Sequence, residues 1–152
     1  MIREVRESDA ARLVEIYSYY VKETAVSFEY EAPSVEEFKN RIRTISAKYP
    51  YLVYEENGEI LGYVYASAYS GREAYNWTVA TSIYVDKNSR KQGIGAALYN
   101  ELETRLYKQG IVNILAAVAY IDTEDEYLTH DSIKFHKRME YKEVAHMIKV
   151  GK

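Results

Sequence analysis

The sequence has no cysteine and no long apolar run, and these two absences narrow the possible functions. Without cysteine, the chain has no disulfide bond, no cysteine nucleophile and no thiolate for a metal, and no metal site is predicted. The longest apolar stretches fall far short of the roughly 20 residues that a membrane helix needs. Residues 1–4 lack the apolar core of a signal peptide, so we expect a cytoplasmic protein that does not bind the membrane.

Proline and glycine are also scarce, with two and seven residues in a chain of 152. These few residues mark no linker between domains, and the sequence contains no internal repeat. The length suits a single domain over residues 1–152 with a hydrophobic core. The formal net charge of −3 gives the chain no general attraction for nucleic acid, so no nucleic-acid partner is predicted. Any anion site must therefore be local, built from backbone amides and a few basic side chains.

Apolar spacing and turn signals predict an alternation of strands and helices. Helices are predicted after the capping residues Ser8 and Asp9, after a capping box at Ser34 and Glu37, from Ile94 to Gly110, and in 131–139. Strands are predicted in 2–5, 51–54, 60–68, 77–85, 114–118 and 142–150, with Asn57-Gly58 as a hairpin turn. This order of about six strands and four helices predicts an α/β (α+β) fold, with a mixed sheet and helices on both faces.

One segment, Arg90-Lys91-Gln92-Gly93-Ile94-Gly95, connects a predicted strand to a predicted helix. The first amides of a helix have no internal partner, and the helix dipole adds positive charge there. Gly93 and Gly95 let the backbone curl and let a ligand approach, so several N–H groups can converge on one phosphate. No lysine followed by serine or threonine comes after the glycines, which excludes a Walker A loop. Taken alone, the segment predicts either an anion site or a tight connection.

This segment and several others resemble the GNAT (Gcn5-related) N-acetyltransferases, whose motif Q/R-x-x-G-x-G/A begins a helix. Within that family the chain is most similar to the phosphinothricin N-acetyltransferase group. The similar segments are 25–29 (AVSFE), 49–53 (YPYLV), 62–67 (GYVYAS) and 75–79 (YNWTV). The resemblance extends from the first strand to about Tyr141. It implies the GNAT fold, with a mostly antiparallel sheet, and commonly a homodimer.

The resemblance also implies an activity, with acetyl-coenzyme A (acetyl-CoA) as cosubstrate. The acetyl group would pass to the amine of a small amino acid-like acceptor, of the phosphinothricin or methionine sulfone type, by direct attack in a ternary complex. Acetylation of a peptide N-terminus or a polyamine is a second interpretation on the same fold. A non-catalytic module that binds coenzyme A is a third.

Site residues follow from the resemblance position by position. Coenzyme A contacts are implied for Ile83, Tyr84, Val85, Arg90, Lys91, Gln92, Gly93, Ile94, Gly95, Ala96, Ser132 and His136. The strand 114–118 should diverge from 77–85, and the thioester should lie in that opening. Acceptor contacts are implied for Phe28, Glu29, Tyr30, Tyr75 and Trp77.

Two residues are catalytic candidates. His136 is implied as a general acid or a coenzyme A contact, and Glu29 as a remote base or a contact to the acceptor's amino group. Tyr141 is assigned to packing. From the residues alone, a single histidine on a short helix is more often structural, and a loop carboxylate is as often simply solvated.

The sequence departs from the family pattern at several positions. Ala80 stands where the family often has glutamate, the favoured base, and alanine takes no proton. Another group, water or a different acceptor must then account for the chemistry. Glu140 stands where a glycine is usual and where φ is often positive. The acidic run 122–126 is either solvated or favours a cationic acceptor. GNAT folds finish with a β-hairpin, so the final strand is expected to be missing, and 144–150 to be frayed or paired with another subunit.

Overall fold

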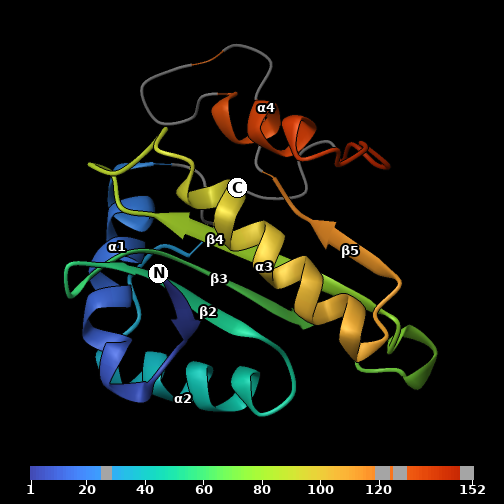
Figure 1. Ribbon diagram of the computed structural model, residues 1–152, viewed down its shortest axis with the longest axis horizontal. Helices are drawn as coiled ribbons and strands as arrows, with labels where there is room; N and C mark the ends of the chain where they lie inside the picture. Colours follow the sequence, from blue (N-terminus) through green and yellow to red (C-terminus); the bar gives the residue numbers. More distant parts are fainter. Residues whose placement is uncertain (25–28, 119–123, 125–129, 148–152) are drawn as a thin grey trace. The chain divides into compact units, whose positions relative to one another are not determined.

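A computed structural model of the chain describes residues 1–24, 29–118, 124 and 130–147. Its elements are β1 (Ile2–Glu4), η1 (Glu7–Asp9), α1 (Ala10–Glu23), α2 (Val35–Ser46), β2 (Tyr51–Glu56), β3 (Glu59–Ala68), η2 (Glu73–Tyr75), β4 (Thr78–Val85), α3 (Ile94–Gln109), β5 (Asn113–Ala116) and α4 (Asp131–Arg138) (Figure 1). They fall into two compact units. The larger comprises Met1–Tyr17 and Pro33–Ala117, and the smaller comprises Ser18–Ala32 and Val118–Lys152. Within the described ranges, no helix has both the length and the apolarity to cross a membrane.

Five strands of the larger unit form one sheet in the order β1-β2-β3-β4-β5. The first four are antiparallel neighbours, whereas β4 and β5 run parallel, with α3 as the crossover between them. The hairpin between β2 and β3 turns at Asn57 and Gly58, and both have the positive φ that a type I′ turn requires. The predicted mixed, mostly antiparallel sheet is thereby confirmed, with five strands in the described part.

Side chains alternate between the two faces of this sheet, and each face packs against different helices. On one face, Gly62 of β3 lies against Ile94 and Leu98 of α3, and Figure 1 shows α3 running along the strands. On the other face, Tyr63 of β3 contacts Phe38 of α2, with ring centroids 6.3 Å apart. The prediction of helices on both faces is therefore confirmed.

The helices begin and end largely where their sequence signals indicate. Ser34 Oγ accepts a hydrogen bond of 3.1 Å from the Glu37 amide at the start of α2. Gly110 ends α3 in the left-handed region, with φ of 90°. Asp9 caps the short helix η1 that precedes α1, because its carboxylate accepts from the Arg6 amide, and it also accepts from the Arg3 guanidinium. The stripe that α3 buries is the predicted one, Ile94, Leu98, Leu102 and Leu106.

Two predicted elements need correction. Residues 142–147, in the predicted last strand, form no strand, and all six are exposed. Without a buried face or a ladder partner, an extended segment gains nothing from becoming a strand. The strand predicted as buried over 114–118 is instead β5, which ends at Ala116 and is mostly half-buried, because it is the outermost strand on its side of the described sheet.

Candidate functional site

The strands β4 and β5 pair over only part of their length. Their parallel ladder begins at Thr78 with Asn113 and ends at Thr81 with Ala116. Beyond that last pair, β4 continues through Ser82–Val85, still paired with β3 on its other side. The ladder between β4 and β5 thus ends four residues before β4 does, close to the glycine-containing turn. An extended ligand can follow a strand in such a place by main-chain pairing.

The turn after β4 has a backbone suited to an anion. Lys91 and Gly93 have φ angles of 62° and 80°, so the chain twice enters the left-handed region before α3 begins. Gly93 occupies the N-cap position of α3, and no side chain caps this helix start among the described residues. The amides of the first turn, Ile94, Gly95 and Ala96, point out of the helix start with its dipole behind them. A Cβ placed on Gly93 would meet nothing within 4 Å, so the surface in front of the turn is open.

Charge around the turn is predominantly positive. Lys87, Arg90 and Lys91 are exposed within five positions, and the first turn of α3 contains no acidic residue. The acidic residue next to the turn, Asp86, pairs with Arg12 of α1 at 2.9 Å. A chain with a net charge of −3 therefore presents a locally cationic loop at a helix start, which is the requirement for binding a phosphate group.

The start of α3 lies unusually close to the sheet. A Cβ added at Gly62 would lie 3.2 Å from Ile94 Cγ2 and 3.2 Å from the Tyr84 carbonyl oxygen. Further along the helix, the Tyr99 hydroxyl and Thr81 Oγ1 are 3.4 Å apart in the buried layer between α3 and β4. Burial raises the pKa of Tyr99 to about 12, despite the opposing effect of its hydrogen bond with Thr81, so Tyr99 stays uncharged. Close packing and a buried polar contact together fix the direction in which the α3 amides point.

Ala80 lies on the sheet face opposite α3. Its neighbours across the strands are Ser67 of β3 and Leu115 of β5, and Tyr84 is on the same face of β4. None of these described neighbours carries a carboxylate. The position that the family pattern gives to a base is thus surrounded, within the sheet, by hydroxyl and apolar groups.

Four tyrosines from β2, β3 and β4 lie in contact on this face. The ring centroids of Tyr51 and Tyr65 are 4.7 Å apart, and those of Tyr63 and Tyr84 are 5.5 Å apart. Burial, together with the neighbouring tyrosines, raises the pKa of Tyr51 and of Tyr63 well above the usual value. These two phenols remain protonated at neutral pH, so they can donate hydrogen bonds but cannot accept a proton from an amine.

His136 belongs to the smaller unit, on α4. Its Nδ1 lies 2.6 Å from the Ser132 carbonyl oxygen, which can only accept, so Nδ1 carries the hydrogen and Nε2 is left as the acceptor. Burial lowers the pKa of His136, with partial opposition from the Ser132 hydrogen bond, and keeps the ring neutral at pH 7. The ring also packs edge-on against Tyr141, at 5.4 Å between centroids. Glu140, between α4 and Tyr141, has the positive φ expected of that position, 68°.

Comparison with known proteins identifies the family. Residues 2–152 match the acetyltransferase (GNAT) domain family. The chain belongs to the GNAT acetyltransferases. It is therefore an N-acetyltransferase that takes its acetyl group from acetyl-CoA, and the fold and cosubstrate expected from the sequence are confirmed.

Individual GNAT relatives cover most of the chain at modest identity. A phosphinothricin N-acetyltransferase of Streptomyces viridochromogenes is 28% identical over 141 residues, which are 92% of this chain and 73% of that protein. An L-methionine sulfoximine/L-methionine sulfone acetyltransferase of Salmonella typhimurium is 27% identical over 99% of this chain and 84% of that protein. The crystal structure of a GNAT superfamily phosphinothricin acetyltransferase from Sinorhizobium meliloti in complex with acetyl-CoA has a TM-score of 0.81 and 33% identity, over 91% of this chain and 72% of that one.

The predicted GNAT site residues are divided between the two units. The larger unit holds Tyr75, Trp77, Ile83, Tyr84, Val85 and the turn from Arg90 to Ala96, whereas the smaller holds Glu29, Tyr30, Ser132 and His136. Phe28 lies outside the described residues.

Within the larger unit, the cofactor candidates form one continuous path along β4 into α3. Tyr75 and Trp77 do not join them. They precede β4, roughly 30 Å along the strand from Asp86 at about 3.3 Å per residue, and both are exposed. Sequence reasoning assigned no role to Gly62, which packs against the start of α3, or to Arg12 and Asp86, which pair beside the bend that precedes the turn. The position of Asp86 directly after a strand was a readable turn signal, but nothing marked its partner on α1.

Proposed function

We propose that this GNAT enzyme acetylates the amine of a small amino acid-like acceptor, of the phosphinothricin or methionine sulfone type. The names of the relatives from Streptomyces viridochromogenes and Salmonella typhimurium support this class of acceptor. The observation that carries the donor half of the proposal is the continuous path from the part of β4 beyond its ladder with β5, through the turn at Lys91 and Gly93, into the start of α3, where no described side chain forms a cap.

On the donor side, we assign the diphosphate of acetyl-CoA to the turn. The amides from Gln92 to Ala96 would bind its oxygens, with Arg90 and Lys91 adding charge at the rim. The pantetheine arm would lie along the main chain of Ile83 to Val85, where β4 has passed the end of its ladder with β5. The thioester would then reach the stretch of β4 near Ala80, on the side of the sheet that carries the tyrosines.

The reaction is a direct acyl transfer. The amine lone pair attacks the thioester carbonyl carbon, the C–S bond breaks, and coenzyme A leaves as a thiolate that takes up a proton. The amine gives up one proton in the same event. We propose His136 and the half-buried Glu29 as the groups that handle these protons. With its hydrogen on Nδ1, neutral His136 presents Nε2 as a proton acceptor, and it acts as a general acid only after it has been protonated.

Ala80 and its described neighbours on the sheet supply no carboxylate to take the amine's proton. The proposed roles of His136 and Glu29 therefore do not depend on position 80.

The donor assignment is tested by binding. Acetyl-CoA should raise the Tm of the chain, and Gly93→Ala should weaken its binding by about tenfold. Gly58→Ala is the matched control, because Gly58 has nearly the same φ, 79° against 80°, and the same open surroundings. Both variants carry the same backbone strain, so a difference in affinity reports the site. No Tm shift with acetyl-CoA in the unmodified chain would overturn the donor assignment.

The acceptor assignment is tested by thiol release from acetyl-CoA with a panel of amines. The panel contains phosphinothricin, methionine sulfone, spermidine and a peptide with a free N-terminus. Turnover confined to the first two supports the proposal. Preference for spermidine or the peptide would replace it with polyamine or N-terminal acetylation on the same fold.

We also propose that the enzyme is a cytoplasmic homodimer. Sedimentation velocity of the purified chain tests the dimer, and a single species with the mass of one 17.7 kDa chain would contradict it.

A further inference from the structure

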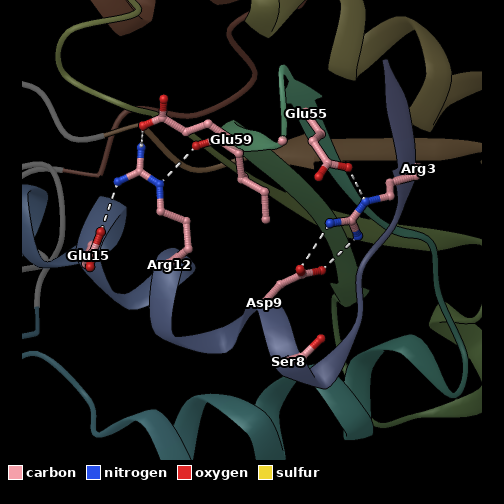
Figure 2. Close-up of a pocket in the computed structure, with 9 residues that line it drawn as sticks. Arg3, Ser8, Asp9, Arg12, Glu15, Glu55 and Glu59 are labelled. Carbon is pink, nitrogen blue, oxygen red and sulfur yellow. Dashed lines mark hydrogen bonds and ion pairs between the residues drawn. The ribbon is translucent and has the colours of Figure 1, made fainter.

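The side chain of Arg12 connects α1 to the chain that leaves β4. Its Nε donates to the Ile60 carbonyl oxygen of β3 at 3.0 Å, and one terminal nitrogen contacts Asp86 Oδ2 at 2.9 Å. Glu15 and Glu59 also contact the guanidinium, at 3.1 and 3.4 Å. Figure 2 shows both carboxylates next to Arg12. All five residues lie in the larger unit. The Arg12 guanidinium is therefore occupied by four oxygen partners and fixed to the backbone of the sheet.

The carboxylate of Asp86 divides its two oxygens between Arg12 and the turn. Oδ2 accepts from Arg12, whereas Oδ1 accepts from the Asn88 amide at 2.9 Å. The main chain of Asp86 is fixed as well, because its amide donates to the Leu61 carbonyl and its carbonyl accepts from the Ser89 amide. Asp86 thus shapes the first bend after β4, and the orientation of its side chain depends on the cation behind it.

We propose that Arg12 is a positioning residue for the diphosphate of coenzyme A. Arg12 holds Asp86, Asp86 holds the bend at Asn88 and Ser89, and this bend sets where Arg90 and the following amides point. The ion pair between Arg12 and Asp86 also acts through charge. Without Arg12, the Asp86 carboxylate, four positions before Arg90, would repel a diphosphate. This inference rests on the proposed donor site and adds to it a residue of α1 that does not touch the ligand.

Two arginine variants separate positioning from general stabilisation. Arg12→Met removes the guanidinium and keeps a long apolar side chain. Arg105→Met is the matched control, because Arg105 also pairs with two carboxylates, Glu101 and Glu4, and its side chain is similarly accessible, 33% against 26% for Arg12. Arg105 lies in α3, well after its first turn.

Two ligands distinguish the contribution of the diphosphate to binding from that of the pantetheine arm. Coenzyme A and S-acetylpantetheine share the pantetheine arm, and the second lacks the diphosphate and the nucleotide. Titrations followed by amide NMR give both Kd values. Arg12→Met should weaken the binding of coenzyme A by about tenfold, because displacing the turn would weaken about one hydrogen bond from the turn to the charged diphosphate. Arg12→Met should change the Kd of S-acetylpantetheine by less than about twofold, and Arg105→Met should change neither Kd. Without ligand, Arg12→Met should also shift the amide signals of Asn88 and Ser89.

Several results would overturn the inference. One is an unchanged affinity of folded Arg12→Met for coenzyme A. Another is an equal loss of affinity for coenzyme A and for S-acetylpantetheine in Arg12→Met. The third is a loss of coenzyme A affinity in Arg105→Met equal to that in Arg12→Met. If Arg12→Met does not fold, Asp86→Asn replaces it, since asparagine keeps an oxygen for the Asn88 amide and loses the charge that Arg12 pairs with. Coenzyme A should then weaken by about threefold, and an unchanged Kd counts against the inference. If the unmodified chain binds no coenzyme A, the proposed donor site is wrong, while the shifts of Asn88 and Ser89 still report whether Arg12 sets the bend.

Discussion

Replacing Gly62 by alanine tests whether the close packing of α3 on β3 sets the position of the anion-binding turn. The added methyl group would lie 3.2 Å from the Tyr84 carbonyl oxygen and 3.2 Å from Ile94 Cγ2. The Tyr84 carbonyl belongs to β4, which is held in place by its pairing with β3. The start of α3 can move outward instead. Because Ile94 is the first residue of α3, an outward movement also displaces the amides of its first turn.

The magnitude follows from two opposing effects. Adding a carbon to a packed core costs about 1–3 kcal/mol. Replacing glycine by alanine returns about 0.4–1 kcal/mol by restricting the unfolded chain, since Gly62 has no left-handed φ to lose. The free energy of unfolding should therefore fall by about 1–2 kcal/mol, and for a chain of this length the Tm should fall by about 3–6 °C. The affinity for coenzyme A should fall by about tenfold, because the first-turn amides no longer converge as before.

Thermal unfolding and calorimetric titration with coenzyme A measure the two effects on the same samples. Gly71→Ala is the control, because a Cβ at Gly71 would meet nothing within 4 Å and its φ is not positive. The control should keep the Tm and the Kd of the unmodified chain. If Gly62→Ala also keeps both values, the packing of α3 on β3 does not set the turn, and the reasoning is refuted.

Three further predictions concern the turn, the missing carboxylate and acid stability. Lys91→Gly should unfold at a Tm about 3 °C above Lys91→Ala, because only glycine accepts the φ of 62° without strain of about 1 kcal/mol. Ala80→Glu should raise kcat/KM for the best amine by about tenfold or more, with Ala80→Gln unchanged, if a base limits the rate. Burial raises the pKa of Asp9, but hydrogen bonds from the Arg3 side chain and the Arg6 amide bring it below its usual value. Stability from Asp9 is thus present above about pH 4 and lost as pH falls through its folded pKa. Urea unfolding of Asp9→Asn should therefore depend less on pH than the unmodified chain between about pH 5 and 3.

The backbone features of the proposed donor site could be predicted from the sequence, because they depend on local signals. Glycine positions, helix starts and strand order leave strong local signals, and Gly93 carries one of them. The supports of the turn were harder to predict. Arg12 reaches Asp86 across 74 positions of sequence, and no local pattern on α1 distinguishes a side chain aimed at a loop from a solvated one. No signal in the sequence distinguishes Gly62 from other strand residues, because its close neighbour Ile94 belongs to a helix far away in the sequence.

The acceptor side depends on proton transfer, which the sequence could not assign. An acceptor that arrives as an ammonium ion loses two protons in each turnover, one before its lone pair can attack and one as the amide forms, and the thiolate takes up one proton. On the sheet face that carries Ala80, burial raises the pKa of Tyr51 and of Tyr63, so these phenols stay protonated, can donate hydrogen bonds and cannot take the amine's proton. The proposed proton acceptors are His136, which is neutral with Nε2 unprotonated, and Glu29, and water is a further acceptor. An amine whose own pKa is near 8, such as a peptide α-amine, loses its proton to water far more readily than one near 10.4, such as lysine. If water takes the proton, activity should follow the acceptor's pKa, whereas a residue base would make the pH dependence the same for every acceptor.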